Sequence, residues 1–172
     1  MKHILITGGS GYIGSKLVPF LLKKGYTITV IDKMDFYNNL SPHPNLKIIS
    51  RDILNTHLED YEGFDAIIHL AGLSNDPMAN FSPNDNFIQN LAVTGMAAFL
   101  AKKAGIPKFI FASSCSVYGN SMDSLCNEYD QTLATFPYGV SKLQCEASLM
   151  QQADKNFKVV ILRDRKSTRL NS

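Results

Sequence analysis

Short apolar runs alternate along the chain with longer stretches in which apolar residues recur at helical spacing. The short runs are rich in β-branched and aromatic residues and stay apolar at consecutive positions. This pattern is typical of parallel strands that are buried on both faces of a sheet. Six strands are predicted, at residues 3–7, 27–31, 46–50, 66–70, 108–112 and 157–162.

The longer stretches predict helices at residues 12–24, 83–104 and 138–153. Gly25 and Gly105 end the first two, and Ser82 stands as an N-cap with Pro83 in the first helical position. Pro19 lies inside the first helix, where it should kink the helix or remove one hydrogen bond. Strands that alternate with helices predict an α/β fold, a Rossmann-type doubly wound parallel sheet.

A glycine-rich loop, TGGSGYIG, joins the first predicted strand to the first predicted helix. Gly8, Gly11 and Gly14 are spaced three apart and leave room for a diphosphate to approach backbone N–H groups at the start of a helix. A flexible turn would need similar residues, but the position between a strand and a helix favours dinucleotide binding. Tyr12 and Ile13 complete the predicted cofactor loop.

Acidic residues follow the second and third predicted strands. Asp32 can accept both ribose hydroxyls of NAD and would repel the extra phosphate of NADP, so NAD is the predicted cofactor. A strand-end aspartate that only caps a turn is the alternative. Lys33, the next residue, could tolerate a phosphate. Asp52 is placed to hydrogen-bond an adenine amine, or is a solvated loop acid.

Tyr138 and Lys142 lie one helical turn apart on one face of the last predicted helix. A tyrosine has an ordinary pKa of about 10, and a nearby ammonium lowers it toward a useful acid/base range. The spacing alone is weak, because Tyr12 and Lys16 share it. The serines at 113, 114 and 116 follow the fifth strand, at the sheet edge where ligands bind in open α/β folds. They could instead serve only in a turn.

Composition sets limits on other classes of function. The 172 residues carry a net charge of +2 and are 45% hydrophobic, which fits one globular domain without the basic face that nucleic acids or membrane surfaces require. The three cysteines, Cys115, Cys126 and Cys145, are odd in number and lack the spacing of a metal site. Disulfides and a metal site are therefore not expected, and a cytoplasmic location is expected. No signal peptide or membrane span is expected. Cys115 is not expected to be a nucleophile, because no histidine follows it.

Taken together, TGGSGYIG, Asp32, HLAG at 69–72, SSCSVYG at 113–119 and PYGVSKLQCE at 137–146 resemble the extended short-chain dehydrogenase/reductase family. Within it, the chain is most similar to the NAD-dependent epimerases and dehydratases. The resemblance runs from residue 1 to about 163 and implies a nucleotide-sugar substrate. It also implies an enzyme that transfers a hydride between a sugar carbon and bound NAD.

The resemblance also assigns roles position by position. Its cofactor-contact positions match Gly8, Gly11, Gly14, Asp32, Asp52, Ile53, Leu70, Ala71 and Gly72, and its catalytic positions match Ser114, Tyr138 and Lys142. Asn90 matches a helix asparagine that supports the active site. Two positions depart from the family pattern: Gly72 stands where alanine is more usual, and Val93 where glycine is.

Several readings of the reaction remain open. Dehydratases of the family usually carry an acidic pair after the catalytic serine, where this chain has Cys115 and Ser116, which favours an epimerase or a simple dehydrogenase. A non-catalytic dinucleotide sensor would commonly lack the Tyr/Lys pair, and an NADP-dependent carbonyl reductase is opposed by Asp32. The resemblance and the apolar positions Phe87, Leu91 and Leu143 suggest a homodimer, unless these residues only cover the sheet.

The resemblance ends near residue 163, and residues 164–172 form a polar tail that does not look native. Residues 1–163 are therefore expected to be an incomplete NAD-binding domain, truncated before the last strand and the substrate-binding region. On that expectation the 172-residue chain by itself is inactive.

Overall fold

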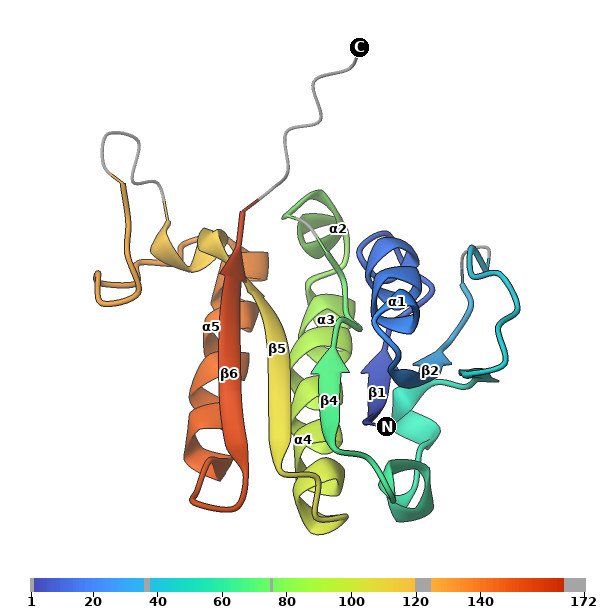
Figure 1. Ribbon diagram of the computed structural model, residues 1–172. Coiled ribbons are helices and arrows are strands. Elements are labelled where there is room, and N and C mark those ends of the chain that lie inside the picture. The colour runs from blue at the N-terminus through green and yellow to red at the C-terminus, as the bar shows by residue number, and fades with distance from the viewer. Residues whose placement is uncertain (1, 36–37, 75, 120–124, 166–172) are drawn as a thin grey trace.

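Figure 1 shows the computed structural model, which describes residues 2–35, 38–74, 76–119 and 125–165. Its strands are β1 (His3–Thr7), β2 (Thr27–Asp32), β3 (Leu46–Ser50), β4 (Ala66–His69), β5 (Lys108–Ser114) and β6 (Lys158–Asp164). They pair in parallel in the order β3-β2-β1-β4-β5-β6. This is the strand order of the Rossmann fold, which confirms the predicted doubly wound sheet.

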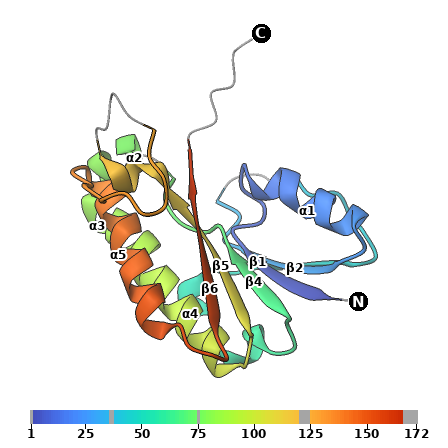
Figure 2. The same cartoon turned by 60° about the vertical axis from the view of Figure 1, so that its left-hand side comes forward.

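The helices lie on both faces of the sheet. Figure 2 shows α1 (Gly14–Lys23) on one face, and α2 (Asp76–Phe81), α3 (Pro83–Phe87), α4 (Val93–Lys103) and α5 (Pro137–Gln152) on the other. A π-helical turn, η3 (Ile88–Ala92), joins α3 to α4. Short 3₁₀ turns are η1 (Ile53–Asn55), η2 (Leu58–Tyr61) and η4 (Cys115–Tyr118). Within the described part of the chain, no helix is long and apolar enough to cross a lipid bilayer.

Two apolar clusters, one on each face, hold the layers together. Successive side chains of a strand point to opposite faces, so Ile4 and Ile6 pack with Val18 of α1, while Leu5 packs in the larger cluster beneath α4 and α5. Each fully buried aliphatic side chain of this kind contributes about 1.5–3 kcal/mol. The larger cluster includes Phe109 and fixes β5 under α5, the two elements that carry the candidate catalytic residues.

The strands differ from the predicted ones mainly at their ends. β5 runs two residues past the predicted end at 112, and β6 runs from 158 to 164 instead of from 157 to 162. The reason is mutual pairing: Ser113 and Ser114 lie opposite Arg163 and Asp164 in the ladder, an interaction that hydropathy does not register. Asp164 therefore belongs to the sheet, one residue beyond the predicted domain boundary.

The helices show larger differences. The predicted helix 83–104 is divided into α3, the π-helical turn and α4, and α2 was not predicted. Ser82 does stand at the N-cap of α3, but its hydroxyl donates to the Asp85 carboxylate at 2.7 Å instead of capping the backbone. Helix α1 begins at Gly14 and continues through Pro19 to Lys23. The turn before Gly14 is thus part of the glycine loop and not of the helix.

Candidate active site

The glycine loop between β1 and α1 packs tightly against itself and against the end of β4. Gly8 has φ +72°, a left-handed conformation, and a Cβ there would lie 2.6 Å from the Ala71 backbone nitrogen. A Cβ on Gly14 would overlap the carbonyl oxygen of Gly9. At Gly11 a Cβ would meet only the Gly8 carbonyl oxygen, at 3.3 Å. Gly8 and Gly14 thus shape the loop, and Gly11 lies on its open side.

Asp32, the last residue of β2, is fixed beside this loop. One carboxylate oxygen accepts from the Ser10 backbone N–H at 2.9 Å, and the other accepts from the Met34 N–H, also at 2.9 Å. The carboxylate is only partly buried and retains lone pairs for a further donor. The geometry combines the two alternatives for Asp32, because it caps the local turn and still presents an acid next to the loop.

Lys33 is held by two further carboxylates. Its Nζ lies 3.4 Å from Asp35 Oδ2 and 3.4 Å from Asp52 Oδ2. Asp52 also accepts from the Leu54 N–H at 2.9 Å, which caps η1. The Lys33 ammonium is thus paired with two carboxylates, and the Asp32 carboxylate precedes it at the end of β2, so acidic side chains at this end of the sheet oppose an additional phosphate.

The loop region fits a dinucleotide. The Ser10 hydroxyl is buried and is one of two buried side-chain polar atoms without a partner among the described residues. Such an orphaned group is expected where a ligand supplies the missing partner. Tyr12 and Ile13 are exposed beside the loop, as a ligand contact requires. The Ile53 side chain is buried in the larger core cluster, so a contact from this residue to a ligand would come from its backbone.

Tyr138 and Lys142 lie in the first half of α5, and both are almost fully buried. The Lys142 Nζ donates to the Ala112 carbonyl of β5 at 3.1 Å and lies 5.8 Å from the centre of the Tyr138 ring. It also lies 4.8 Å from the ring centre of Phe111. Burial lowers the pKa of Lys142 to about 8, because the charged form is poorly solvated there. The ammonium is thus fixed between β5 and the tyrosine ring.

Ser114 ends β5 and opens the turn η4. Its hydroxyl accepts from the Ser116 N–H at 3.2 Å and donates to the Ser116 hydroxyl, also at 3.2 Å. The turn lies directly on α5, since a Cβ on Gly139 would come within 2.6 Å of the Ser116 carbonyl oxygen. The structure therefore brings the predicted Ser114, Tyr138 and Lys142 to the same edge of the sheet. In Figure 1 this is the edge toward which the strand arrows point.

Asn90 lies at the centre of the π-helical turn and is completely buried. Its Nδ2 donates to Asn86 Oδ1 at 2.7 Å and to the Ser141 hydroxyl at 3.2 Å, and Ser141 in turn donates to the Tyr138 carbonyl at 2.8 Å. Asn86 donates to the Pro137 carbonyl at 3.1 Å. Asn90 thus supports the first turn of α5. Sequence reasoning missed Asn86 and Ser141, although their spacings from Asn90 and Tyr138, four and three residues, could have indicated them.

The network around Asn90 explains why glycine stands at position 72, where alanine is more usual in the family pattern. A Cβ at this position would overlap Asn90 Oδ1, the second buried polar atom without a partner among the described residues. Gly72 also has φ +135°, in the region that favours glycine. Leu70 and Ala71 lead to it from the end of β4 and are half-buried beside the glycine loop. The fourth-strand segment therefore lies between the loop and Asn90, as a cofactor-lining segment would.

His69, at the end of β4, lies beneath the site and is neutral. Its Nδ1 is 2.7 Å from the Thr7 hydroxyl, and its Nε2 is 3.1 Å from the Thr94 hydroxyl. Burial, assisted by the nearby Lys142 charge, lowers its pKa to about 3. With both ring nitrogens occupied and no accessible charge, His69 is a structural part of the sheet and does not transfer protons.

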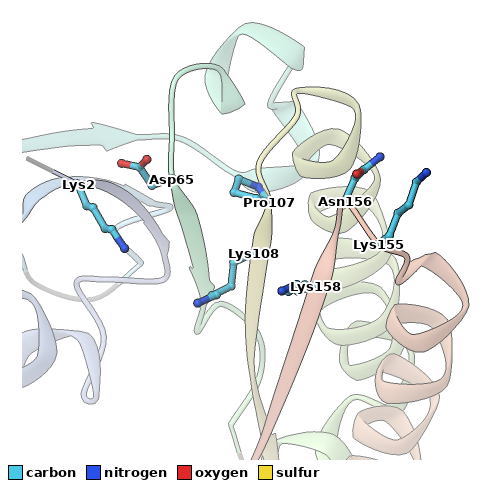
Figure 3. Close-up of a pocket in the computed structure, with 7 residues that line it drawn as sticks. All are labelled: Lys2, Asp65, Pro107, Lys108, Lys155, Asn156 and Lys158. Atoms are coloured by element: carbon cyan, nitrogen blue, oxygen red, sulfur yellow. The ribbon is translucent and has the colours of Figure 1, made fainter.

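A cavity of about 480 Å³ lies at the opposite end of the strands, and Figure 3 shows the residues that line it. It is lined by Lys2, Asp65, Pro107, Lys108, Lys155, Asn156 and Lys158. None of the predicted site residues lies in it. The chemistry-bearing residues are gathered at the carboxyl ends of the strands instead.

The chain is similar to known proteins in both sequence and fold. UDP-glucose 4-epimerase 3 of Oryza sativa subsp. japonica is 32% identical over 179 residues, covering 93% of this chain and 48% of the rice protein. The solved UDP-N-acetylglucosamine 4-epimerase from Methanobrevibacter ruminantium M1, in complex with UDP-N-acetylmuramic acid, superposes with a TM-score of 0.87 at 31% identity, covering 94% of this chain and 54% of its own. MoeE5 in complex with UDP-glucose and NAD gives a TM-score of 0.83 at 29% identity, covering 94% and 53%.

The chain spans about half the length of the relatives that it matches. Residues 4–164 match the sequence profile of the NAD-dependent epimerase/dehydratase family, which is nearly the whole of the region that folds into the sheet and its helices. The chain therefore belongs to the NAD-dependent epimerase/dehydratase family.

Proposed function

We propose that the protein is a nucleotide-sugar epimerase, in which the chain provides the NAD site and the proton-transferring residues. The observation that supports this most directly is the convergence of Ser114, Tyr138 and Lys142, with the lysine buried between β5 and the tyrosine ring. NAD, when bound, accepts a hydride from the sugar carbon and can return it. Gly8, Gly11, Gly14 and Asp32 are the residues that would hold it.

Residues of this chain transfer the proton of the sugar hydroxyl. Tyr138 takes the proton from the sugar hydroxyl during oxidation and gives it back during reduction. The Lys142 ammonium, 5.8 Å from the centre of the Tyr138 ring, would stabilise negative charge on the tyrosine. Ser114 donates a hydrogen bond to the sugar oxygen and so fixes it beside Tyr138. Because the pKa of Lys142 is about 8, this stabilisation is present at neutral pH and weakens above it.

Two features narrow the reaction. The residues that follow Ser114 are Cys115 and Ser116, so this turn offers no carboxyl group to remove water from the sugar, and an epimerase is favoured over a dehydratase. The acids around Lys33 oppose the additional phosphate of NADP and so disfavour a carbonyl reductase that uses it. The intact protein then acts by oxidation followed by reduction from the opposite face.

Incubation of the intact protein with NAD and UDP-glucose tests the proposal. We expect the sugar to equilibrate with its C4 epimer, as followed by proton NMR of the anomeric signals, without net accumulation of NADH, because the hydride returns to the same carbon. UDP-N-acetylglucosamine and UDP-glucuronic acid are tested in parallel. Loss of water, steady accumulation of NADH, or no turnover with any of the three sugars would contradict an epimerase.

The same proposal includes a homodimer that forms through the outer faces of α4 and α5. Leu91 packs against the core cluster, so it partly covers the sheet, but Phe99 on α4 and Met150 on α5 are each 58% exposed. If these side chains form one contiguous surface across the two helices, that surface would be of the kind that marks an interaction site. A second copy of the chain, packing the same two helices, would bury them.

Phe99→Glu should convert the dimer to a monomer, because it places a charge on this surface, which the second copy would bury. Light scattering of the intact protein is expected to give twice the chain mass, and the variant the mass of one chain. Phe20→Glu is the matched control, since Phe20 is 55% exposed on α1, on the other face of the sheet. A monomeric parent protein, or a Phe20→Glu variant that dissociates equally, would count against this interface.

A further inference from the structure

A partly buried ion pair connects α5 to the ends of β5 and β6. Glu146 lies one helical turn after Lys142 on α5, and its side chain is only 6% exposed. Arg163 Nη2 donates to Glu146 Oε2 at 2.8 Å, and its Nε lies 3.2 Å from both carboxylate oxygens. The Ser113 hydroxyl donates to Oε1 of the same carboxylate. A strand end and a helix that are far apart in the sequence are thus joined through one carboxylate.

The other side of Arg163 faces Tyr118, the last residue of η4. Arg163 Nη1 donates to the Tyr118 hydroxyl at 2.8 Å, and the guanidinium carbon lies 4.9 Å from the tyrosine ring centre. The Tyr118 hydroxyl donates in turn to the Asn127 carbonyl at 2.8 Å, and Nη1 reaches the Glu128 carbonyl at 3.4 Å. Arg163 therefore fixes both the turn η4 and the segment that begins at 125.

These contacts enclose Ser114 from both directions along the chain. Ser113 precedes it and is bound to Glu146, while Tyr118 follows four residues later and is bound to Arg163. Glu146 belongs to the same helix as Tyr138 and Lys142. The separation between Ser114 and the tyrosine helix thus depends on a pair of residues outside the site.

We propose that Glu146 and Arg163 are positioning residues, which hold Ser114 at its working distance from Tyr138 and Lys142. This proposal rests on the proposed function, because only a catalytic role for Ser114 requires a fixed distance between Ser114 and Tyr138. A buried ion pair often stabilises a fold no more than apolar residues of the same size would. The planar donors of an arginine do, however, fix direction as well as distance, and here they fix three segments at once.

Kinetics of the intact protein with Glu146→Gln provide the first test. The amide keeps the size of the side chain but loses the charge that orients Arg163. A displacement of about 1 Å can lower a rate about 100-fold, so we expect kcat to fall about 10–100-fold while KM and NAD affinity stay within about 3-fold. The kcat of Arg163→Lys should lie between that of the parent protein and that of Glu146→Gln. Millimolar guanidinium should restore part of the activity of Arg163→Ala.

Asp154→Asn is the matched control. It removes the ion pair of Lys102 Nζ with Asp154 Oδ2, which at 2.8 Å is as short as the Glu146 pair but is exposed and links α4 to the turn before β6. We expect kcat to be unchanged in this variant. Wild-type kcat in Glu146→Gln, or an equal loss in Asp154→Asn, would overturn the positioning role.

Amide hydrogen exchange tests the same role without any assay of activity. In Glu146→Gln, exchange should accelerate at Ser116, Gly119 and Leu133, whose N–H groups are bonded within and across η4, while the glycine loop stays unchanged. Unchanged exchange, or a uniform rise over the whole chain, would overturn the proposal. If the parent protein turns over no sugar, the proposed function fails, and the exchange result still decides the positioning role.

Discussion

Replacement of Tyr138 by phenylalanine is expected to lower kcat by about 10²–10⁴-fold and to leave NAD affinity within about 2-fold. Tyr138 is 8% exposed, and the phenylalanine ring can occupy the same space beside Lys142, so the change removes only the hydroxyl that we propose as the proton-transferring group. The variant should therefore fold like the parent protein. Steady-state kinetics with whichever of the three UDP-sugars the parent protein turns over measure kcat, and calorimetric titration with NAD measures the affinity.

The control for this prediction is Tyr26→Phe. Tyr26 precedes β2 at the opposite end of the strands from the site. The control also removes a tyrosine hydroxyl, and we expect it to leave kcat unchanged. If Tyr138→Phe keeps more than half of the parent activity, Tyr138 is not the acid/base, and the proton must be transferred by another group at this edge of the sheet.

Gly14→Ala is expected to abolish cofactor binding, with a loss of affinity of more than about 100-fold, or about 2.7 kcal/mol. The new Cβ would overlap the carbonyl oxygen and carbon of Gly9, which are backbone atoms and cannot rotate away as a side chain would. The loop has to change shape to admit it. Overpacking of this kind typically costs about 1–3 kcal/mol of stability, so the free energy of unfolding should fall as well.

The sign of the change in stability of Gly14→Ala distinguishes overlap with Gly9 from an effect of helix propensity. Gly14 is the first residue of α1, where alanine would be better than glycine by about 1 kcal/mol on propensity alone. Gly11→Ala is the companion variant, because its Cβ would meet only the Gly8 carbonyl oxygen at 3.3 Å. It should change stability little and weaken NAD binding through its position on the open side of the loop. A stabilised Gly14→Ala variant with normal NAD affinity would show that the overlap is relieved without consequence.

The strands could be predicted from the sequence because each is a continuous apolar run, and such runs occur where both faces of a sheet are covered. Their ends could not. Ser113 and Arg163 are polar, and they continue β5 and β6 only because each strand provides the other's hydrogen-bond partners. Pairing between segments fifty residues apart leaves no trace in the local pattern.

The π-helical turn could not be predicted for a different reason. Residues 88–92 continue the helical spacing of their neighbours, and the widening becomes visible only when Asn90 is seen to turn inward toward Asn86 and Ser141. π-helical turns of this kind occur often at functional sites, where they point a particular side chain in a direction that a regular helix would not allow.

The candidate catalytic residues were predicted from motifs, whereas Glu146 and Arg163 were not. Glu146 follows Lys142 by four residues and so lies on the same face of α5, which could have marked it as a second polar group facing β5. For Arg163 the sequence carries no such signal. Its partners Tyr118 and Glu146 come from two other elements and meet it only in the folded sheet.

The position of Arg163 on β6 bears on the order in which the protein matures during its synthesis. The glycine loop, β1–β4 and the segment to Gly72, which would hold the nucleotide, leave the ribosome first, and Arg163 emerges about 90 residues after Gly72. At about 5–20 residues per second this separates the two events by roughly 5–18 s. A nascent chain can thus complete its nucleotide pocket well before Ser114 is fixed opposite Tyr138. Reactivity toward a sugar would arise only after β6 has added to the sheet.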